Sequence, residues 1–318
     1  MARDVIVTEN LTKHYGNVVG VESLDLRVSE GEIFGFLGPN GAGKTTTMRL
    51  LMGLLSPTAG SATILDLDCW KRSVEVKRIV GYLPGEPAMY KRLTGERLIR
   101  FVAGFGADEK AGFDFSERLE LDVSRQLREY SRGMKQKMAL TLALMRRAPL
   151  IIMDEPTNGL DPLTQYVLYE ILQEQREAGV TVLFSSHNLP EVERISDRVG
   201  IIKDGRLATV QKIDELRNLK LRNVDITFRG QPPEGLDRLP GISGFEKAGD
   251  RLQLKLRGDI NPLLKAIAGV EVADLAIAHA SLEDVFLEYY SLPGEEHAGP
   301  GAQAPADGDS GPGQGGGS

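Results

Sequence analysis

The chain has 318 residues and a mass of 34.7 kDa, more than a single average domain needs. Its 41% hydrophobic and 26% charged residues are ordinary for a soluble globular protein and exclude a wholly disordered chain. The net charge of −7 excludes the broad basic surface that non-specific nucleic-acid binding needs, so we expect no nucleic-acid partner. The single cysteine, Cys69, excludes a secreted fold held by internal disulfides.

Segments that direct a chain into or across a membrane are also missing from the sequence. The N-terminal run MARDVIVTEN has no apolar core of a signal peptide. No window approaches the roughly 18 consecutive apolar residues of a membrane helix. We therefore expect a cytoplasmic protein that contacts a membrane only through a partner.

The first 210 residues alternate between strand-like and helix-like patterns. Eight runs are typical of strands, several of them apolar on both faces: DVIVTENL, SLDLRV, GEIFGFLG, SATILDL, RIVGYLP, LIIMDEP, VTVLFSSH and RVGIIKDG. Helix patterns lie at about 43–55, 94–105, 133–147, 162–177 and 189–195. This alternation predicts an α/β domain, residues 1–210, with a mostly parallel sheet. The first strands have no helix between them, which indicates an antiparallel β subdomain.

The rest of the chain divides into three zones. We expect a linker helix at 211–221, a small C-terminal α+β domain at 222–290 and a disordered Gly/Pro-rich tail at 291–318. In the small domain, VDITFRG, RLQLKLRG and EVADLAIAH are typical of strands, and INPLLKAIAG and SLEDVFLEYY of helices. The runs PPEG and LPGISG indicate turns.

A glycine-rich loop carries the strongest chemical signal. The run GPNGAGKTT matches the pattern G-x-x-x-x-G-K-[S/T], follows an apolar strand and opens a helix. In such a loop the backbone N–H groups face one anion, and the helix N-terminus adds positive potential. Lys44 can reach the β- and γ-phosphates, and the Thr45 hydroxyl can ligate Mg²⁺. We predict binding of ATP and Mg²⁺, with the nucleotide contacting Gly38, Pro39, Asn40, Gly41, Ala42, Gly43, Lys44, Thr45 and Thr46.

Two carboxylates end the apolar strand LIIMDE. Asp154 suits Mg²⁺, and Glu155 lies where a base can polarise an attacking water. Paired acids at a strand end are common, because strands emerge into polar loops. Here they follow a phosphate loop, and parallel sheets bind ligands at the carboxyl ends of their strands. We therefore predict Asp154 as a metal ligand and Glu155 and Lys44 as catalytic residues.

With these motifs the chain resembles the nucleotide-binding subunits of ABC (ATP-binding cassette) transporters. The resemblance covers about two-thirds of the chain and implies a P-loop NTPase core with antiparallel β and helical subdomains. The run YSRGMKQ resembles the family signature loop, whose serine and second glycine are present as Ser131 and Gly133. The first glycine of the family loop is replaced by Arg132. The family's glutamine is replaced by Met134, or it corresponds to Gln136 if the alignment is shifted. The resemblance implies that Ser131 and Gly133 contact the γ-phosphate held by an opposite subunit. The residues alone also allow a surface helix capped by Ser131.

Three further positions match motifs of this family. NGLDP resembles its D-loop, which implies Asp161 at the dimer interface, although Asp161 also fits an N-cap before a helix that begins at Pro162. His187 matches the switch histidine, which implies a hydrogen bond to the γ-phosphate and support for Glu155. Tyr15 matches the aromatic residue on which adenine stacks.

One position departs from the family pattern. After the strand RIVGYL the family has a glutamine that ligates Mg²⁺, and this sequence has Gly85. Two explanations remain open at this point: water fills that ligand position, or the neighbouring Glu86 reaches inward.

The resemblance also implies the biological role. A signature loop that acts in trans implies a two-fold dimer of identical chains with two complete ATP sites. The run SLEDVFL resembles the closing helix of bacterial exporter cassettes, which pair with a separate integral membrane subunit. We thus expect an ATPase that powers export and lies at the inner face of the cell membrane through that subunit. A nucleotide-gated regulator or scaffold, uncoupled from transport, is the main alternative.

Overall fold

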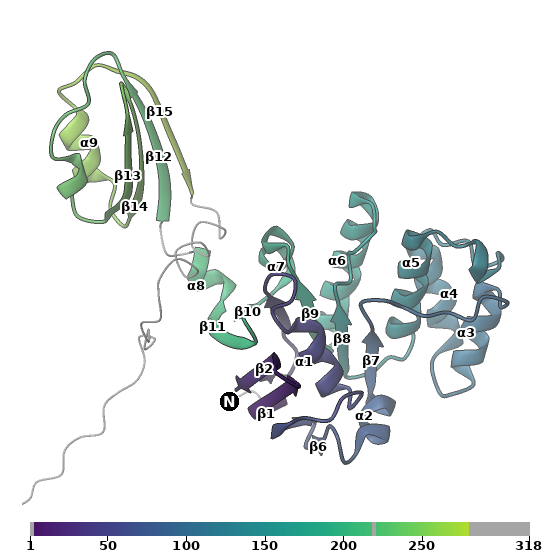
Figure 1. Ribbon diagram of the computed structural model, residues 1–318. Helices are drawn as coiled ribbons and strands as arrows, with labels where there is room; N and C mark the ends of the chain where they lie inside the picture. Colours follow the sequence, from purple (N-terminus) through teal and green to yellow (C-terminus); the bar gives the residue numbers. More distant parts are fainter. Residues whose placement is uncertain (1–2, 218–220, 280–318) are drawn as a thin grey trace, which may run out of the picture.

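The computed structural model describes residues 3–217 and 221–279 (Figure 1). Its centre is a six-stranded sheet in the order β11-β10-β4-β9-β8-β7. The strands are β4 (Ile33–Leu37), β7 (Val80–Leu83), β8 (Leu150–Asp154), β9 (Thr181–Ser186), β10 (Arg198–Lys203) and β11 (Arg206–Lys212). All pairings are parallel except that of β10 with β11. The expectation of a mostly parallel sheet is confirmed.

Helices cover both faces of this sheet, which explains why β4, β8 and β9 are buried throughout (Figure 1). The covering helices include α1 (Lys44–Leu51), α2 (Ser73–Ile79), α6 (Pro162–Glu177) and α7 (Leu189–Ile195). Alternate residues of β9 enter different cores: Phe184 packs with residues of α6 and α7, and Leu183 packs with residues of α1. The carboxyl ends of the strands are thereby held in fixed positions.

A second, antiparallel sheet confirms the expected β subdomain. It has the order β2-β1-β5-β6, with β3 also paired to β1. Its strands are β1 (Asp4–Tyr15), β2 (Val18–Leu24), β3 (Arg27–Ser29), β5 (Ala59–Ile64) and β6 (Leu67–Asp68). The run SLDLRV, predicted as one strand, is divided between β2 and β3. There the Thr8 hydroxyl donates to Leu24 O at 2.7 Å and accepts from Leu26 N at 2.8 Å, beside the backbone bond from Thr8 N to Leu26 O at 2.9 Å.

The chain between β7 and β8 forms the helical part of the fold. It contains α3 (Gly95–Ala103), α4 (Glu109–Arg118), the 3-10 turn η1 (Leu127–Glu129) and α5 (Arg132–Leu144). Thr94 and Asp108 cap α3 and α4, each accepting from a backbone N–H three residues ahead. Helix α4 was not predicted, because a glycine and two aromatic residues interrupt its helical pattern of apolar and polar residues.

The small C-terminal sheet has the order β13-β14-β12-β15, all antiparallel. Its elements are β12 (Leu221–Phe228), η2 (Leu236–Arg238), β13 (Ile242–Ala248), β14 (Arg251–Arg257), α9 (Asn261–Ile267) and β15 (Val272–His279). The prediction of LPGISG as a turn is wrong from Ile242 onward, where β13 begins. Gly241 and Gly244 adopt positive φ there, so the turn-like composition reflects local backbone shape within a sheet.

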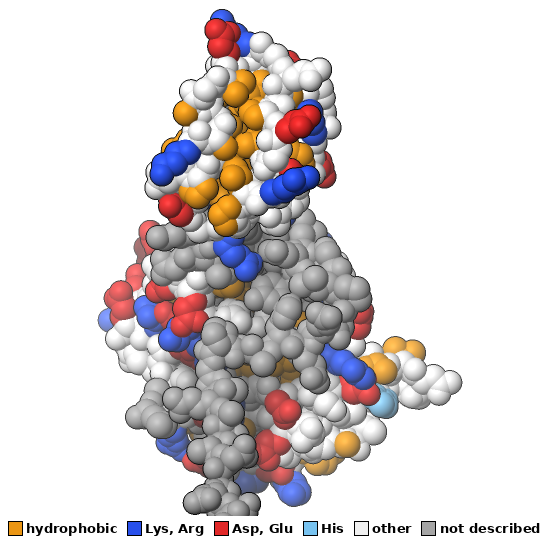
Figure 2. Space-filling model, turned by 90° about the vertical axis from the view of Figure 1, so that its left-hand side faces the viewer, with side chains coloured by type: hydrophobic (Ala, Val, Ile, Leu, Met, Phe, Trp, Pro, Cys, Tyr) orange, Lys and Arg blue, Asp and Glu red, His pale blue; other side chains and the backbone are white. Residues whose placement is uncertain are grey.

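Part of the helix-bearing face of this sheet stays open. Leu275 and Ile277 pair with the buried Ile226 and Val224 and so point to the same side, yet they are 36% and 43% exposed. Figure 2 shows hydrophobic side chains gathered on this face of the small domain. The expected linker contains α8 (Ile213–Arg217). The helix expected at SLEDVFLEYY and the tail at 291–318 lie outside the described residues.

Candidate functional site

The phosphate loop has a backbone that only glycine permits at its tightest points. Gly41 and Gly43 have φ of 84° and 107°. A Cβ on Gly43 would lie 2.4 Å from Gly20 O, and one on Gly38 would lie 2.4 Å from Ile202 O. The loop is therefore closed in by β2 and β10, and α1 begins directly after it at Lys44.

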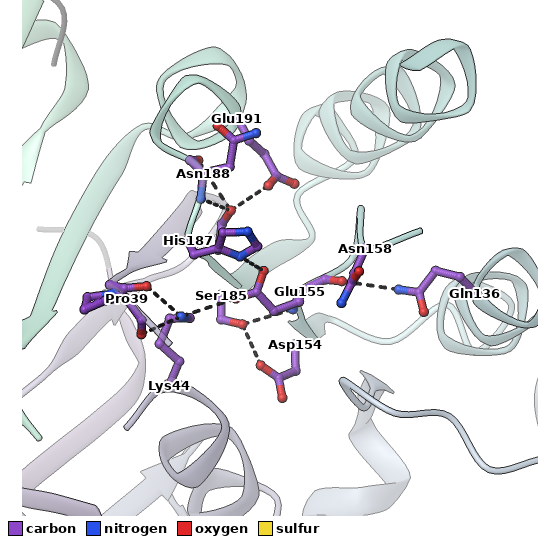
Figure 3. A network of polar contacts seen from close by, with 12 residues as sticks. Pro39, Lys44, Gln136, Asp154, Glu155, Asn158, Ser185, His187, Asn188 and Glu191 are labelled. Carbon is purple, nitrogen blue, oxygen red and sulfur yellow. Dashed lines mark hydrogen bonds and ion pairs between the residues drawn. The ribbon is translucent and has the colours of Figure 1, made fainter. Parts of the chain in front are cut away.

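Lys44 is almost fully buried, and its side chain folds back onto the phosphate loop that precedes it. Its Nζ donates to Gly38 O at 2.6 Å and to Pro39 O at 3.0 Å. It also forms an ion pair with Glu155 Oε1 at 3.2 Å (Figure 3). The charge of Lys44 is thus held between the loop carbonyls and the end of β8.

Glu155 is the meeting point of the polar network in Figure 3. Its φ of 51° lies in the left-handed region, which is unfavourable for a non-glycine residue by about 1 kcal/mol or more. This turn directs one carboxylate oxygen to Lys44 and the other to His187 Nδ1, at 2.8 Å. His187 follows β9, so the parallel pairing of β8 and β9 brings the two residues together.

Asp154 is 1% exposed and has two carboxylate oxygens in different situations. Oδ1 accepts from the Ser185 hydroxyl at 2.6 Å, and Glu155 N donates to the same hydroxyl at 3.0 Å. Oδ2 is buried with no hydrogen-bond partner among the described residues. A buried carboxylate oxygen without a partner is costly and fits a cation ligand. Thr45 is the other residue present that would hold Mg²⁺, from the first turn of α1.

A cleft of about 460 Å³ runs along the phosphate loop. It is lined by Tyr15 from the end of β1, by the first residues of β2, by the phosphate loop and by Glu155, Asn158 and His187. Tyr15 is 44% exposed, and Lys13 Nζ lies 5.5 Å from its ring centroid. The structure therefore brings Tyr15, Lys44, Thr45, Glu155 and His187 to one cavity.

Ser131, Gly133 and Asp161 lie outside that cleft, although Asn158, the first residue of the run NGLDP, lines it. Ser131 is exposed and caps α5, its Oγ accepting from Met134 N at 3.2 Å. Asp161 caps α6 in the same way through Thr164 N at 3.0 Å. A Cβ on Gly133 would lie 2.9 Å from Gly159 O, so the two loops touch each other. Both residues act as N-caps here, and neither Ser131, Gly133 nor Asp161 lines the cleft of the same chain.

Gln136 is a residue whose role the sequence left open. It is 4% exposed, and its Nε2 donates to Pro156 O at 2.9 Å and to Glu155 O at 3.3 Å. Arg132 donates to Asn158 Oδ1 at 2.8 Å from the same helix. The helical part is thereby fastened to the segment that follows Glu155.

Gly85 lies against the buried carboxylate of Asp154. A Cβ at this position would stand 2.8 Å from Asp154 Oδ2. Glu86 is exposed and lines a separate hollow of about 320 Å³ with Arg132, Lys135 and Gln136. In this placement Glu86 does not line the cleft that contains Lys44 and Thr45.

Three further residues that sequence reasoning missed are Ser185, Ser186 and Glu191. The Ser-Ser pair stands at the end of β9 directly before His187, and that position was the available signal. Glu191 gave no signal, because it looks like an ordinary acidic residue in the first turn of a short helix. Its carboxylate is nevertheless buried beside Ser186.

Comparisons with known proteins agree with this geometry. Residues 21–158 match the family model described as ABC transporter, and residues 212–290 match that of the C-terminal domain of DrrA1-3-like ATP-binding proteins. The bacitracin transport ATP-binding protein BcrA of Bacillus licheniformis is 34% identical over 298 residues, covering 89% of this chain and 96% of that protein. The Nod factor export ATP-binding protein I of Cupriavidus metallidurans is 33% identical over 294 residues, covering 89% and 96%.

Solved structures give the same result for the fold. A structure of an ATP-binding subunit of an ABC transporter superposes with a TM-score of 0.62 at 31% identity, covering 67% of this chain and 92% of that one. A dimeric structure of a bacterial ABC transporter cassette has a TM-score of 0.61 at 25% identity, covering 65% and 98%. The chain therefore belongs to the ATP-binding subunits of ABC transporters, and it is an ATP-hydrolysing cassette of that family.

Proposed function

We propose that this chain hydrolyses ATP in the cleft beside its phosphate loop and thereby powers an exporter whose membrane-spanning part is a separate subunit. The observation that carries the proposal is the convergence of Lys44, Glu155 and His187 in one cavity. Lys44 and Glu155 are 3.2 Å apart, and Glu155 and His187 are 2.8 Å apart. The three come from different elements, which only the folded chain brings together.

The chemistry follows from what each side chain can do. Lys44 exchanges its loop carbonyls for the β- and γ-phosphates, and Tyr15 provides a ring on which adenine stacks. Glu155 accepts a proton from the attacking water, while His187 orients that carboxylate and donates to the γ-phosphate. Thr45 and Asp154 would hold Mg²⁺, which when bound neutralises charge on the phosphates.

A second copy of the chain would complete the site. Ser131 and Gly133 lie outside the cleft that holds Lys44, so one chain does not offer them to its own nucleotide. In a two-fold dimer each signature loop faces the partner's cleft, and two equal sites result. The dimeric bacterial cassette with which this chain superposes supports the arrangement.

An exposed aromatic cluster supports a membrane partner. Tyr90, Phe101 and Phe105 are 64%, 50% and 68% exposed, with ring centroids 6.1 Å apart for Tyr90–Phe101 and 5.2 Å apart for Phe101–Phe105. Tyr90 precedes α3, Phe101 lies on it and Phe105 follows it, all in the chain segment after Gly85. Clustered aromatic residues on a surface are typical of protein interfaces.

The name of one relative, the Nod factor export ATP-binding protein I, supports export as the direction of transport. Among the described residues, every helix is too short or too polar to span a bilayer. We infer a peripheral position at the inner face of the cell membrane, held there by the membrane subunit.

The proposal is tested with Glu155→Gln, His187→Ala and Lys44→Ala. The first should bind ATP and dimerise without turnover, the second should lose turnover, and Lys44→Ala should lose ATP binding. Tagged Glu155→Gln is then recovered from detergent-solubilised membranes with ATP and Mg²⁺. A co-purifying multi-span protein that is lost in Phe101→Ser/Phe105→Ser supports the exporter. ATP-dependent dimers that retain only soluble partners would instead support a regulator or scaffold.

A further inference from the structure

The mechanism above leaves one buried acid unused. Glu191 lies on α7 and is 4% exposed. Its Oε2 lies 2.6 Å from the hydroxyl of Ser186, the residue that precedes His187 in the chain (Figure 3). Ser186 O also accepts from Gly38 N at 3.2 Å, so this serine joins the phosphate loop to the histidine.

The surroundings of Glu191 disfavour its charge. Its Oε1 is buried with no hydrogen-bond partner among the described residues. Burial is the main cause that raises the pKa of Glu191 to about 7, and the nearby Glu155 raises it further, against opposing contributions from Ser186, Thr157 and His187. From α6, Tyr169 also faces this carboxyl, and Arg194 lies 5.8 Å from the Tyr169 ring centroid.

Counting protons at Ser186 leads to the same conclusion by geometry alone. Its Oγ accepts from Asn188 N at 2.9 Å and has two acceptors within reach, Glu191 Oε2 at 2.6 Å and Asn188 O at 3.3 Å. A hydroxyl has one proton and two lone pairs. When Glu191 is ionised, the Ser186 hydroxyl donates its proton to the carboxylate, and Asn188 O receives no hydrogen bond from Ser186. With Glu191 protonated, the acid donates to Oγ, Oγ donates to Asn188 O, and every contact is used.

We propose that Glu191 is a positioning residue for hydrolysis: in its neutral form it completes the hydrogen bonds that fix Ser186 and Asn188 on either side of His187, and ionisation of Glu191 releases them. This inference rests on the proposed role of His187 and Glu155. The γ-phosphate adds negative charge near His187, so bound ATP further favours the neutral acid.

The test compares Glu191→Gln and Glu191→Ala with the parent chain. The glutamine amide donates to Ser186 as the protonated acid does, but it does not titrate; alanine removes the contact. ATPase kcat is measured at saturating ATP from pH 6 to 9. The ratio of kcat for Glu191→Gln to that of the parent should be near one at pH 6. At one pH unit above the pKa of Glu191, this ratio should rise to about ten. At that pH only about one in eleven molecules of the parent has Glu191 protonated. Glu191→Ala should be about tenfold slower than the parent at pH 6.

A second readout does not depend on turnover. The chain has four histidines, so the imidazole NMR signals of His187 are assigned by comparison with His187→Ala. In the parent these signals should follow the ionisation of Glu191, and in Glu191→Gln that transition should vanish.

Each result decides the question. A kcat ratio that stays flat across the pH range overturns the proposal, and so does a Glu191→Gln chain as slow as Glu191→Ala at pH 6. If Glu191→Ala does not fold, the pH dependence of the kcat ratio for Glu191→Gln tests the proposal without it. Retained turnover in Glu155→Gln or His187→Ala would instead overturn the proposed site. A flat ratio beside an inactive Glu155→Gln overturns only the role of Glu191.

Discussion

Gly85 and Asp154 are in such close contact that a side chain at residue 85 requires one of the two residues to shift: a Cβ there would lie 2.8 Å from Asp154 Oδ2. That oxygen is buried, and the same carboxylate is fixed through Oδ1 by Ser185 at 2.6 Å. The glycine at a position where the family has glutamine is thus part of how this chain packs its carboxylate.

Restoring a side chain at this position should therefore harm the enzyme. Gly85→Ala and Gly85→Gln should displace Asp154 and weaken the apparent affinity for Mg²⁺ by about tenfold, the order seen when ligand-orienting contacts are lost. Glu86→Ala is the matched control and should leave the Mg²⁺ dependence of ATPase activity unchanged, because Glu86 is exposed. A gain in Mg²⁺ affinity in Gly85→Gln would contradict this account.

Ser185 should matter both for stability and for turnover. Ser185→Ala removes the donor to Asp154 and the acceptor for Glu155 N, both in buried surroundings. The free energy of unfolding should fall by about 1–3 kcal/mol, and kcat should fall with it. Ser185→Cys keeps a weak donor of similar shape and should lie between the alanine variant and the parent. Urea unfolding and steady-state kinetics measure the two effects, and an unchanged kcat in Ser185→Ala would be evidence against coupling.

Tyr15 should affect ATP binding more than chemistry, because its ring lines the cleft from the end of β1, whereas Glu155 and His187 follow β8 and β9. Stacking of a base on an aromatic ring contributes about 1–3 kcal/mol. Tyr15→Ala should therefore raise the KM for ATP by about tenfold or more, with kcat within a factor of about two. Tyr15→Phe keeps the ring and should behave as the parent. Equal losses in both variants would assign the effect to the hydroxyl.

The stability of the parent chain should depend on pH through Glu191. Its pKa rises from 4.5 to about 7 on folding, so the folded chain holds this proton more tightly than the unfolded chain. The contribution is fully present below pH 4.5, falls as pH rises and is lost above pH 7. The total is about 3 kcal/mol. Relative to the parent, Glu191→Gln should gain about this much stability between pH 4.5 and pH 8, measured by urea unfolding followed through Trp70. A pH-independent difference would contradict the raised pKa.

The sequence predicted most elements of the cassette and failed where composition conflicts with environment. The apolar strands around LIIMDEP and VTVLFSSH were visible because parallel strands are buried on both faces. The strand β13 was missed because its glycines and exposed side chains look like a loop. Helix α2 was missed because it is short and buries only Val76.

The amino-acid sequence by itself determined the phosphate loop and the acidic pair at the end of β8, because each is a contiguous pattern with a local physical meaning, whereas His187 was found only through the resemblance to the family. Only the tertiary structure decided what surrounds them. Asp154 meets Ser185 across 31 residues, Gln136 of α5 meets Pro156 across 20, and Gly85 lies against Asp154 just after the neighbouring strand β7. These contacts depend on how parallel strands end side by side and on how α5 packs beside them, and the order of residues along the chain does not specify either.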